Sequence, residues 1–217
     1  DCGDAGAVMW TGAIGTVMDC IFIKNTADQR GGAVFLQEGL NKDGTIENCE
    51  NTTFAYSRFV DNVAGLNGGA IDWHAGSRNG NVSYCYFENN VANRSAGAIY
   101  WSGHNGTITH SNFTLNRALG IALGPMPNGT MTYGGDAGAV MWTGALGIVD
   151  ECIFVNNSAT QRGGAIFLQA GLTANGTVQN CENTTFKNSL FADNVAGLNG
   201  GAIEWLRGAR NGVVDNV

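Results

Sequence analysis

The sequence contains little charge, and most of that charge is acidic. Only 13% of its 217 residues are charged, the formal net charge is −7, and Lys and Arg together number 11. Nucleic-acid binding needs clustered Lys and Arg, so this class of partner is excluded. No apolar run approaches the ~20 residues of a membrane-spanning helix. No secretory signal opens the chain, so we expect any targeting segment to lie outside this sequence.

Residues that commonly serve catalysis or metal binding are also sparse. His74, His104 and His110 show neither metal-site nor triad spacing. The acidic residues largely follow the internal repeat, as in the pair Asp72 and Glu204, whereas a reaction centre has no need of translational symmetry. We therefore predict a chain that is not an enzyme, with no catalytic residues, no metal site and no cofactor.

A duplication accounts for most of the sequence. Residues 3–80 align without a gap with residues 135–212, and 55 of these 78 positions are identical. The offset of 132 residues defines two copies of a long repeat, at 1–132 and 133–217, of which the second is incomplete. We expect a single domain over 1–217 that is an uncapped slice of a longer repeat protein.

A shorter unit of about 26–28 residues lies within this long repeat. Its first motif is GGAI or a close variant, and we use its alanine as an anchor. The anchors are Ala7, Ala33, Ala70, Ala98, Ala139, Ala165 and Ala202. Its second motif is F-x-x-N, with phenylalanines Phe22, Phe59, Phe87, Phe113, Phe154 and Phe191 and asparagines Asn25, Asn62, Asn90, Asn116, Asn157 and Asn194. Longer spacings are insertions, which we expect to form loops.

The pattern within each unit favours short strands. Period-2 apolar stretches are broken by Gly and Asn, and no 3.6-residue stripe is sustained. With about three short strands per unit, the sequence predicts an all-β fold, a parallel β-helix solenoid whose coils stack ~4.8 Å apart. Identical residue types then form rows along the axis, with the Phe row as one and stacked Asn amides at a turn as another.

A third row lies two residues after each anchor and includes Asp72 and Glu204. Because carboxylates are tolerated there, we predict that this row faces outward. Its apolar members are Met9, Phe35, Tyr100, Met141 and Phe167. Such a row could bind a ligand, associate laterally with other copies, or only stack across coils.

The linked GGAI and F-x-x-N motifs resemble the repeats of the chlamydial polymorphic membrane proteins. The longer form CIFVNNSATQRGGAIF at 152–167 also resembles the adhesin-like surface proteins of methanogenic archaea. The resemblance covers essentially the whole chain. It implies a right-handed β-helix, export to the cell surface, and a role in adhesion or as a stalk. It implies no catalytic residues.

Asparagine sequons provide a second indication of export. Nine N-x-S/T sites occur, more than composition predicts by chance, at Asn51, Asn81, Asn93, Asn105, Asn112, Asn128, Asn156, Asn175 and Asn183. We predict N-glycosylation of a secreted chain. Asn112 precedes Phe113 on a strand, so its side chain should point outward. The alternative is that these motifs, Asn-Gly-Thr above all, reflect turn chemistry.

The six cysteines permit two interpretations. Cys20, Cys85 and Cys152 share one row but lie two coils apart, too far to pair with one another. Cys49 and Cys181 lie in the insertions, about one coil from Cys20 and Cys152 respectively. The disulfides Cys20–Cys49 and Cys152–Cys181 are therefore one hypothesis. Buried thiols that act as small apolar fillers are the other.

Together these features predict a non-catalytic extracellular protein of the cell surface, an adhesin-like rod or stalk. Its partner would be another copy of itself, another cell surface or a glycan. The first alternative is a structural subunit of an extracellular fibre or sheath. A pectate-lyase-like carbohydrate-active enzyme is a less favoured alternative, because β-helices also host such enzymes.

Overall fold

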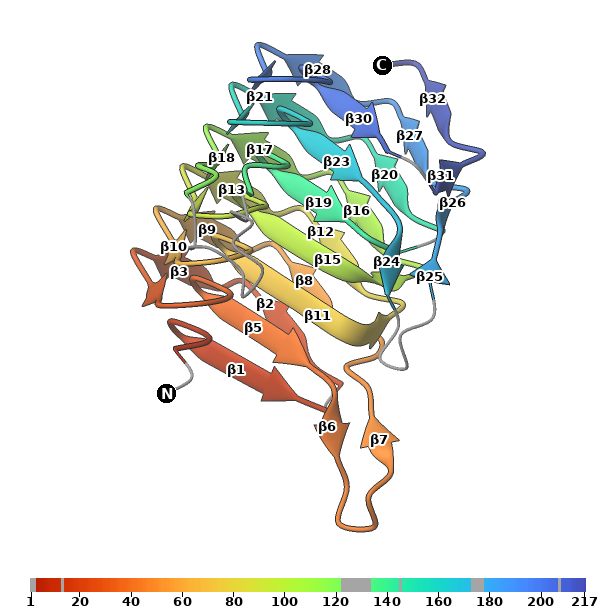
Figure 1. The fold of residues 1–217 in the computed structure, drawn as a ribbon. Coiled ribbons are helices and arrows are strands. Elements are labelled where there is room, and N and C mark those ends of the chain that lie inside the picture. The colour runs from red at the N-terminus through yellow and green to blue at the C-terminus, as the bar shows by residue number, and fades with distance from the viewer. Residues whose placement is uncertain (1–2, 13, 122–133, 145, 173–177, 207) are drawn as a thin grey trace, which may run out of the picture.

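The computed structural model describes residues 3–12, 14–121, 134–144, 146–172, 178–206 and 208–217. These residues form a parallel β-helix, in which successive coils add strands to four parallel sheets (Figure 1). The two ends of the chain lie at opposite ends of the stack. The predicted fold class is therefore confirmed.

Two sheets have seven strands each. Sheet A contains β1 (Val8–Thr11), β5 (Val34–Gln37), β11 (Ile71–Arg78), β15 (Ile99–His104), β19 (Val140–Trp142), β23 (Ile166–Leu168) and β30 (Ile203–Trp205). Sheet B contains β2 (Thr16–Met18), β8 (Thr53–Ala55), β12 (Asn81–Ser83), β16 (Thr107–Thr109), β20 (Ile148–Asp150), β27 (Thr185–Lys187) and β32 (Val213–Asp215).

The other two sheets have six strands each. Sheet C contains β3 (Ile21–Ile23), β9 (Arg58–Val60), β13 (Tyr86–Glu88), β17 (Asn112–Thr114), β21 (Ile153–Val155) and β28 (Leu190–Ala192). Sheet D contains β4 (Thr26–Ala27), β10 (Val63–Ala64), β14 (Val91–Ala92), β18 (Arg117–Ala118), β22 (Ser158–Ala159) and β29 (Val195–Ala196). Strands of two residues are too short for a period-2 signal, so the expected three strands per coil are in fact four.

One predicted insertion and its copy form hairpins, whereas most of the insertion after Gly120 lies outside the described residues. The first of these hairpins is antiparallel and consists of β6 (Gly39–Leu40) and β7 (Ile46–Glu47), which project away from the sheets (Figure 1). Its copy pairs β24 (Gly171–Leu172) with β25 (Val178–Gln179). After it, β26 (Cys181–Glu182) pairs in parallel with β31 (Ala209–Arg210).

The coil turns at four corners, where one residue has a left-handed backbone with φ between 48° and 64°. At the corner from sheet D to sheet A this residue is the first of the Gly pair, such as Gly31, or an alanine such as Ala96. At the corner from sheet C to sheet D, the left-handed residue is the one before the asparagine of the F-x-x-N motif, for example Asn89 before Asn90. The asparagines of the predicted Asn row therefore follow the left-handed residue and are not left-handed themselves.

The predicted Phe and Asn rows run through the interior. Rings of adjacent coils stack with centroids 4.7–4.8 Å apart, as Phe87 does on Phe113. From Asn25 to Asn157, the amide of each row asparagine donates to the Oδ1 of the next one, at 2.9 Å from Asn90 to Asn116. The same amide also donates to a backbone carbonyl, that of Phe59 in the case of Asn90. A buried polar row is thus satisfied within itself.

The inward row of sheet A contains tryptophan in five coils and leucine in two, and the residue before the sheet B strand of the same coil changes with it. Where Trp101 or Trp142 points inward, the facing residue is Gly106 or Gly147, and a Cβ on either glycine would lie under 3.0 Å from an indole carbon. Where a leucine takes the tryptophan position, the corresponding residue is a buried threonine, as in the coils of Leu36 with Thr52 and Leu168 with Thr184. The residue pair therefore keeps the volume of the coil roughly constant.

Candidate binding face on the outer side of sheet A

The corner between sheets D and A carries a row of polar residues, three positions before each anchor. The row consists of Asp4, Arg30, Asn67, Ser95, Asp136, Arg162 and Asn199. Each of these residues directly precedes the left-handed corner residue. Parallel bridges join Asn67 to Ser95 and Arg162 to Asn199, so the row continues the register of the stack.

Two Asp–Arg pairs recur in this corner row. Arg162 donates from Nε and Nη2 to the two carboxylate oxygens of Asp136, at 2.8 Å each. Arg30 donates to Asp4 in the same way, at 3.1 Å each. Bidentate geometry makes these pairs more specific than ordinary surface ion pairs. The hydrogen bonds that Arg162 donates to Asp136 raise the pKa of the Arg162 guanidinium.

The row two residues after each anchor faces away from the main core, which agrees with the prediction. Most of its apolar side chains are nevertheless buried, which the sequence did not predict. Phe35 and Phe167 are completely buried and Met141 is nearly so, whereas Met9 remains 54% exposed. The guanidinium of Arg162 lies 4.6 Å above the ring of Phe167, and Arg30 lies 4.8 Å above Phe35. Corner arginines that fold over the sheet therefore cover these rings.

The buried carboxylate Asp72 occupies the same row. Sequence reasoning placed it outside, yet it is fully buried, and neither carboxylate oxygen has a hydrogen-bond partner. His74 Nδ1 lies 3.7 Å from its Oδ1, and the Nε2 of that ring is 3.3 Å from Nη1 of Arg30. Burial raises the pKa of Asp72, although His74 and Arg30 act in the opposite direction. A neutral carboxyl is the form that burial favours.

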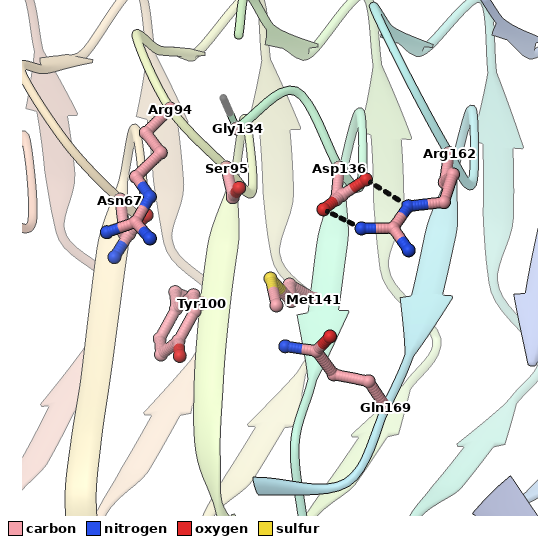
Figure 2. A pocket seen from close by; sticks show the side chains of 9 residues that line it. All are labelled: Asn67, Arg94, Ser95, Tyr100, Gly134, Asp136, Met141, Arg162 and Gln169. Carbon is pink, nitrogen blue, oxygen red and sulfur yellow. Dashed lines mark hydrogen bonds and ion pairs between the residues drawn. The ribbon is translucent and has the colours of Figure 1, made fainter. Parts of the chain in front are cut away.

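A hollow of about 250 Å³ opens on this face, where the two copies of the long repeat meet. Its lining residues come from the corner row, from β15 and β19, and from adjoining turns, and they are Asn67, Arg94, Ser95, Tyr100, Gly134, Asp136, Met141, Arg162 and Gln169 (Figure 2). The lining is mainly polar, with one aromatic ring and one thioether. Such a mixture suits hydrogen bonding to a small polar ligand.

The polar groups of the hollow are not all engaged by one another. The Oδ1 of Asn67 is buried and has no hydrogen-bond partner. None of the ion pairs within the described ranges involves Arg94. Burial raises the pKa of Tyr100 to about 12, so its phenol stays protonated at neutral pH and can donate. The hollow thus offers an acceptor, a cation and a donor.

Sequence reasoning missed most of this hollow. It selected Tyr100 and Met141, but not Arg94, Asn67 or Gln169. A comparison of the residues three positions before each anchor alanine would have identified the corner row from the sequence. No other coil has an arginine at the position of Arg94, so no repeat in the sequence indicates that Arg94 lies beside Tyr100.

A second exposed feature lies at the corner between sheets B and C. The rings of Tyr56 and Tyr84 stack at 5.0 Å, and His110 stacks on Tyr84 at 4.5 Å. The Nε2 of His110 lies 2.8 Å from a carboxylate oxygen of Glu151 in the next coil. All four side chains are exposed. Sequence reasoning missed this aromatic column too, because these residues occupy a corner rather than a strand.

The sequons fall into three groups. Asn51, Asn105, Asn156 and Asn183 are exposed at left-handed corner positions. Asn81, Asn93 and Asn112 are half-buried, and Asn112 points away from the core as predicted. Asn128 and Asn175 lie outside the described residues. Glycosylation itself stays a prediction.

Neither hypothesised disulfide, Cys20–Cys49 or Cys152–Cys181, is formed among the described residues. Cys20, Cys49, Cys85, Cys152 and Cys181 are all free thiols. The Sγ atoms of Cys49 and Cys152 contact the backbone oxygens of Gln37 and Asp150, at 3.0 and 3.2 Å. Burial raises the pKa of Cys152 to about 12 and that of Cys181 to about 11. The alternative interpretation, buried thiols as fillers, fits the described residues.

Among the described residues, no group of three or more His, Cys, Asp or Glu side chains could hold a metal ion. No helix that could cross a membrane occurs within those same ranges. The fold and the corner row thus define a β-helical repeat protein with a polar corner beside the outer face of sheet A.

Comparison with known proteins agrees with this class. Residues 19–37, 84–100 and 151–169 match the family model described as the Chlamydia polymorphic membrane protein repeat. Each match begins near a sheet C strand, passes through sheet D and ends in sheet A. Together they cover about a quarter of the chain. No curated protein and no solved structure matches the chain. The resemblance to archaeal surface proteins stays a prediction.

Proposed function

We propose that this chain forms a non-catalytic rod at the cell surface, adhesin-like in that the outer face of sheet A binds a ligand on another surface. The observation that carries the proposal is the match of three coils to a membrane-protein repeat, within a stack whose interior rows are satisfied by their own neighbours. Such a stack lengthens without changing its cross-section, which suits a stalk. The exposed sequons support an extracellular location.

Adhesion can be measured with the purified chain fixed to beads. We expect the beads to attach to cells or to glycan-coated surfaces, and the soluble chain to compete for attachment. Beads that carry the unfolded chain are the matched control, since composition and charge are then identical. Equal attachment by folded and unfolded chains, or attachment by neither, would contradict an adhesive role.

The fibre alternative is favoured by a different observation. The outer face of sheet C carries one in-register row in which Ile21, Tyr86, Ile153 and Leu190 are between 39% and 64% exposed. Arg58 and Asn112 interrupt this row. A row with four large apolar side chains this exposed favours lateral contact with another copy. Sedimentation velocity with electron microscopy separates the two functions, because a fibre subunit forms ordered filaments and an adhesive rod stays monomeric.

A further inference from the structure

The hollow on sheet A has an uncompensated positive charge. Asp136 and Arg162 neutralise each other through their bidentate pair. Arg94 reaches towards Tyr100 from the opposite side, beside Asn67 (Figure 2). No ion pair of the described residues includes Arg94. A guanidinium presents a planar fork of donors that matches a carboxylate.

We propose that this hollow binds a sugar residue that carries a carboxylate, and that Arg94 holds the carboxylate. The inference rests on the proposed adhesive function and names its ligand class. The carboxylate of Asp136 would repel an anion if it were free. Its pairing with Arg162 at 2.8 Å on both oxygens removes most of this repulsion.

The remaining polar groups fit the hydroxyl groups of a sugar. A sugar hydroxyl can donate to the buried Oδ1 of Asn67, which would satisfy an acceptor that now has no partner. The hydroxyl of Ser95 and the amide of Gln169 can each donate or accept. The phenol of Tyr100 keeps its proton at neutral pH. A simple anion such as acetate would leave these groups unused.

The size and the apolar part of the hollow also favour a single sugar ring. The volume of about 250 Å³ falls just below the roughly 300–1,000 Å³ of pockets for drug-sized ligands. Tyr100 and Met141 line the same hollow, so the C–H groups of a pyranose can contact an aromatic ring and a thioether. An acidic peptide side chain has no comparable set of hydroxyl groups.

Isothermal titration calorimetry of the full chain provides the test, with sodium glucuronate, sodium galacturonate and N-acetylneuraminate as probes. Methyl glucoside and sodium acetate are the controls for the ring and for the charge. We expect at least one acidic sugar to bind at least tenfold more tightly than both controls. Arg94→Ala should weaken that binding at least tenfold, and Arg94→Lys should weaken it less. Arg58→Ala, at an exposed arginine on sheet C, should leave it unchanged.

Several outcomes would overturn the inference. These are equal affinity for the acidic sugar and methyl glucoside, equal affinity for acetate, no binding of any acidic sugar, or full binding by Arg94→Ala. Thermal unfolding of each variant shows whether the fold is kept. The bead assay separates this failure from failure of the proposed function: attachment that acidic sugars do not inhibit retains the adhesin and rejects this ligand.

Discussion

The indole ring of Trp142 lies directly against Gly147, where an added Cβ would stand 2.7 Å from Cζ2. In the coil that has Leu168 in place of the tryptophan, the corresponding residue is Thr184. Size is therefore exchanged within a coil, and the two positions should be coupled energetically.

Gly147→Thr should destabilise the fold by about 1–3 kcal/mol, because the added atoms overpack the core. Trp142→Leu alone should also destabilise it, because it leaves a cavity. The double substitution should recover about 0.5–3 kcal/mol relative to the sum of the single ones. Denaturant unfolding measures each value, with Ser83→Thr as a control outside the core. Strict additivity would show that the pairing is incidental.

The Asn row should contribute strongly to stability. Asn116→Ala removes the acceptor of both the backbone N–H and the side-chain amide of Asn90. Two buried donors lose their partners, so we expect a loss of about 2–4 kcal/mol. Asn112→Ala, at an outward position on β17, should change stability by less than about 0.5 kcal/mol. Similar losses for the two variants would mean that burial of the amide row carries no special cost.

Asp72 should make stability depend on pH. Burial raises its pKa in the folded state above the ordinary value of 3.8. Folding therefore favours the protonated carboxyl of Asp72. Its contribution to the free energy of unfolding is complete below pH 3.8 and is lost as the pH rises through the folded-state pKa. Asp72→Asn should lack this loss and be the more stable protein at neutral pH. Melting temperatures from pH 3 to pH 8 check this, and parallel curves for both proteins would refute it.

The thiols should react according to their burial. In the folded chain without reductant, the half-buried Cys20 should be alkylated, while Cys85, Cys152 and Cys181 resist, since burial raises the pKa of these three thiols to between about 11 and about 12. After unfolding without reductant, Cys49 should react as well. Intact mass counts the labels, and peptide mapping locates them. Paired Cys20–Cys49 and Cys152–Cys181 that resist alkylation even when unfolded would restore the disulfide hypothesis.

Glycan occupancy of the native protein should follow exposure. We expect glycans first at the corner sequons Asn51, Asn105, Asn156 and Asn183. Asn81 should be a poor site, because it is half-buried and its Nδ2, the atom that would carry the glycan, donates to Ser83 Oγ at 3.4 Å. Glycopeptide mass spectrometry measures each site. Bare asparagines at all four corners would assign these motifs to turn chemistry alone.

The rows of the interior were predictable because each residue there repeats in phase with its neighbours. Residues of the same type as Phe87, Asn90 and Ile99 occur at the same positions of successive coils. Parallel pairing places equivalent positions of adjacent coils directly beside each other. The outer face was less predictable. Whether Phe35 is exposed depends on Arg30, which belongs to another row and folds over the ring from the corner. Alternation along a strand gives the direction of a side chain, but not what covers it.

The hollow was the least predictable feature for a related reason. Arg94 and Gln169 are 75 positions apart and belong to different copies of the long repeat. They share one cavity only because the coils of β15 and β23 lie two steps apart in sheet A. Gln169 repeats Gln37, but no other coil has an arginine at the position of Arg94, so the cation of the hollow leaves no repeated signal.

The two Asp–Arg pairs have one further consequence. Asp4 with Arg30 and Asp136 with Arg162 lie four coils apart, which places them about 19 Å from each other along the axis, at ~4.8 Å per coil. The length of the duplicated unit therefore fixes the distance between the two equivalent Asp–Arg pairs. A polymer with a repeat of the same length could contact both Asp–Arg pairs at once. After the first contact, the effective concentration of the polymer at the second pair would be high.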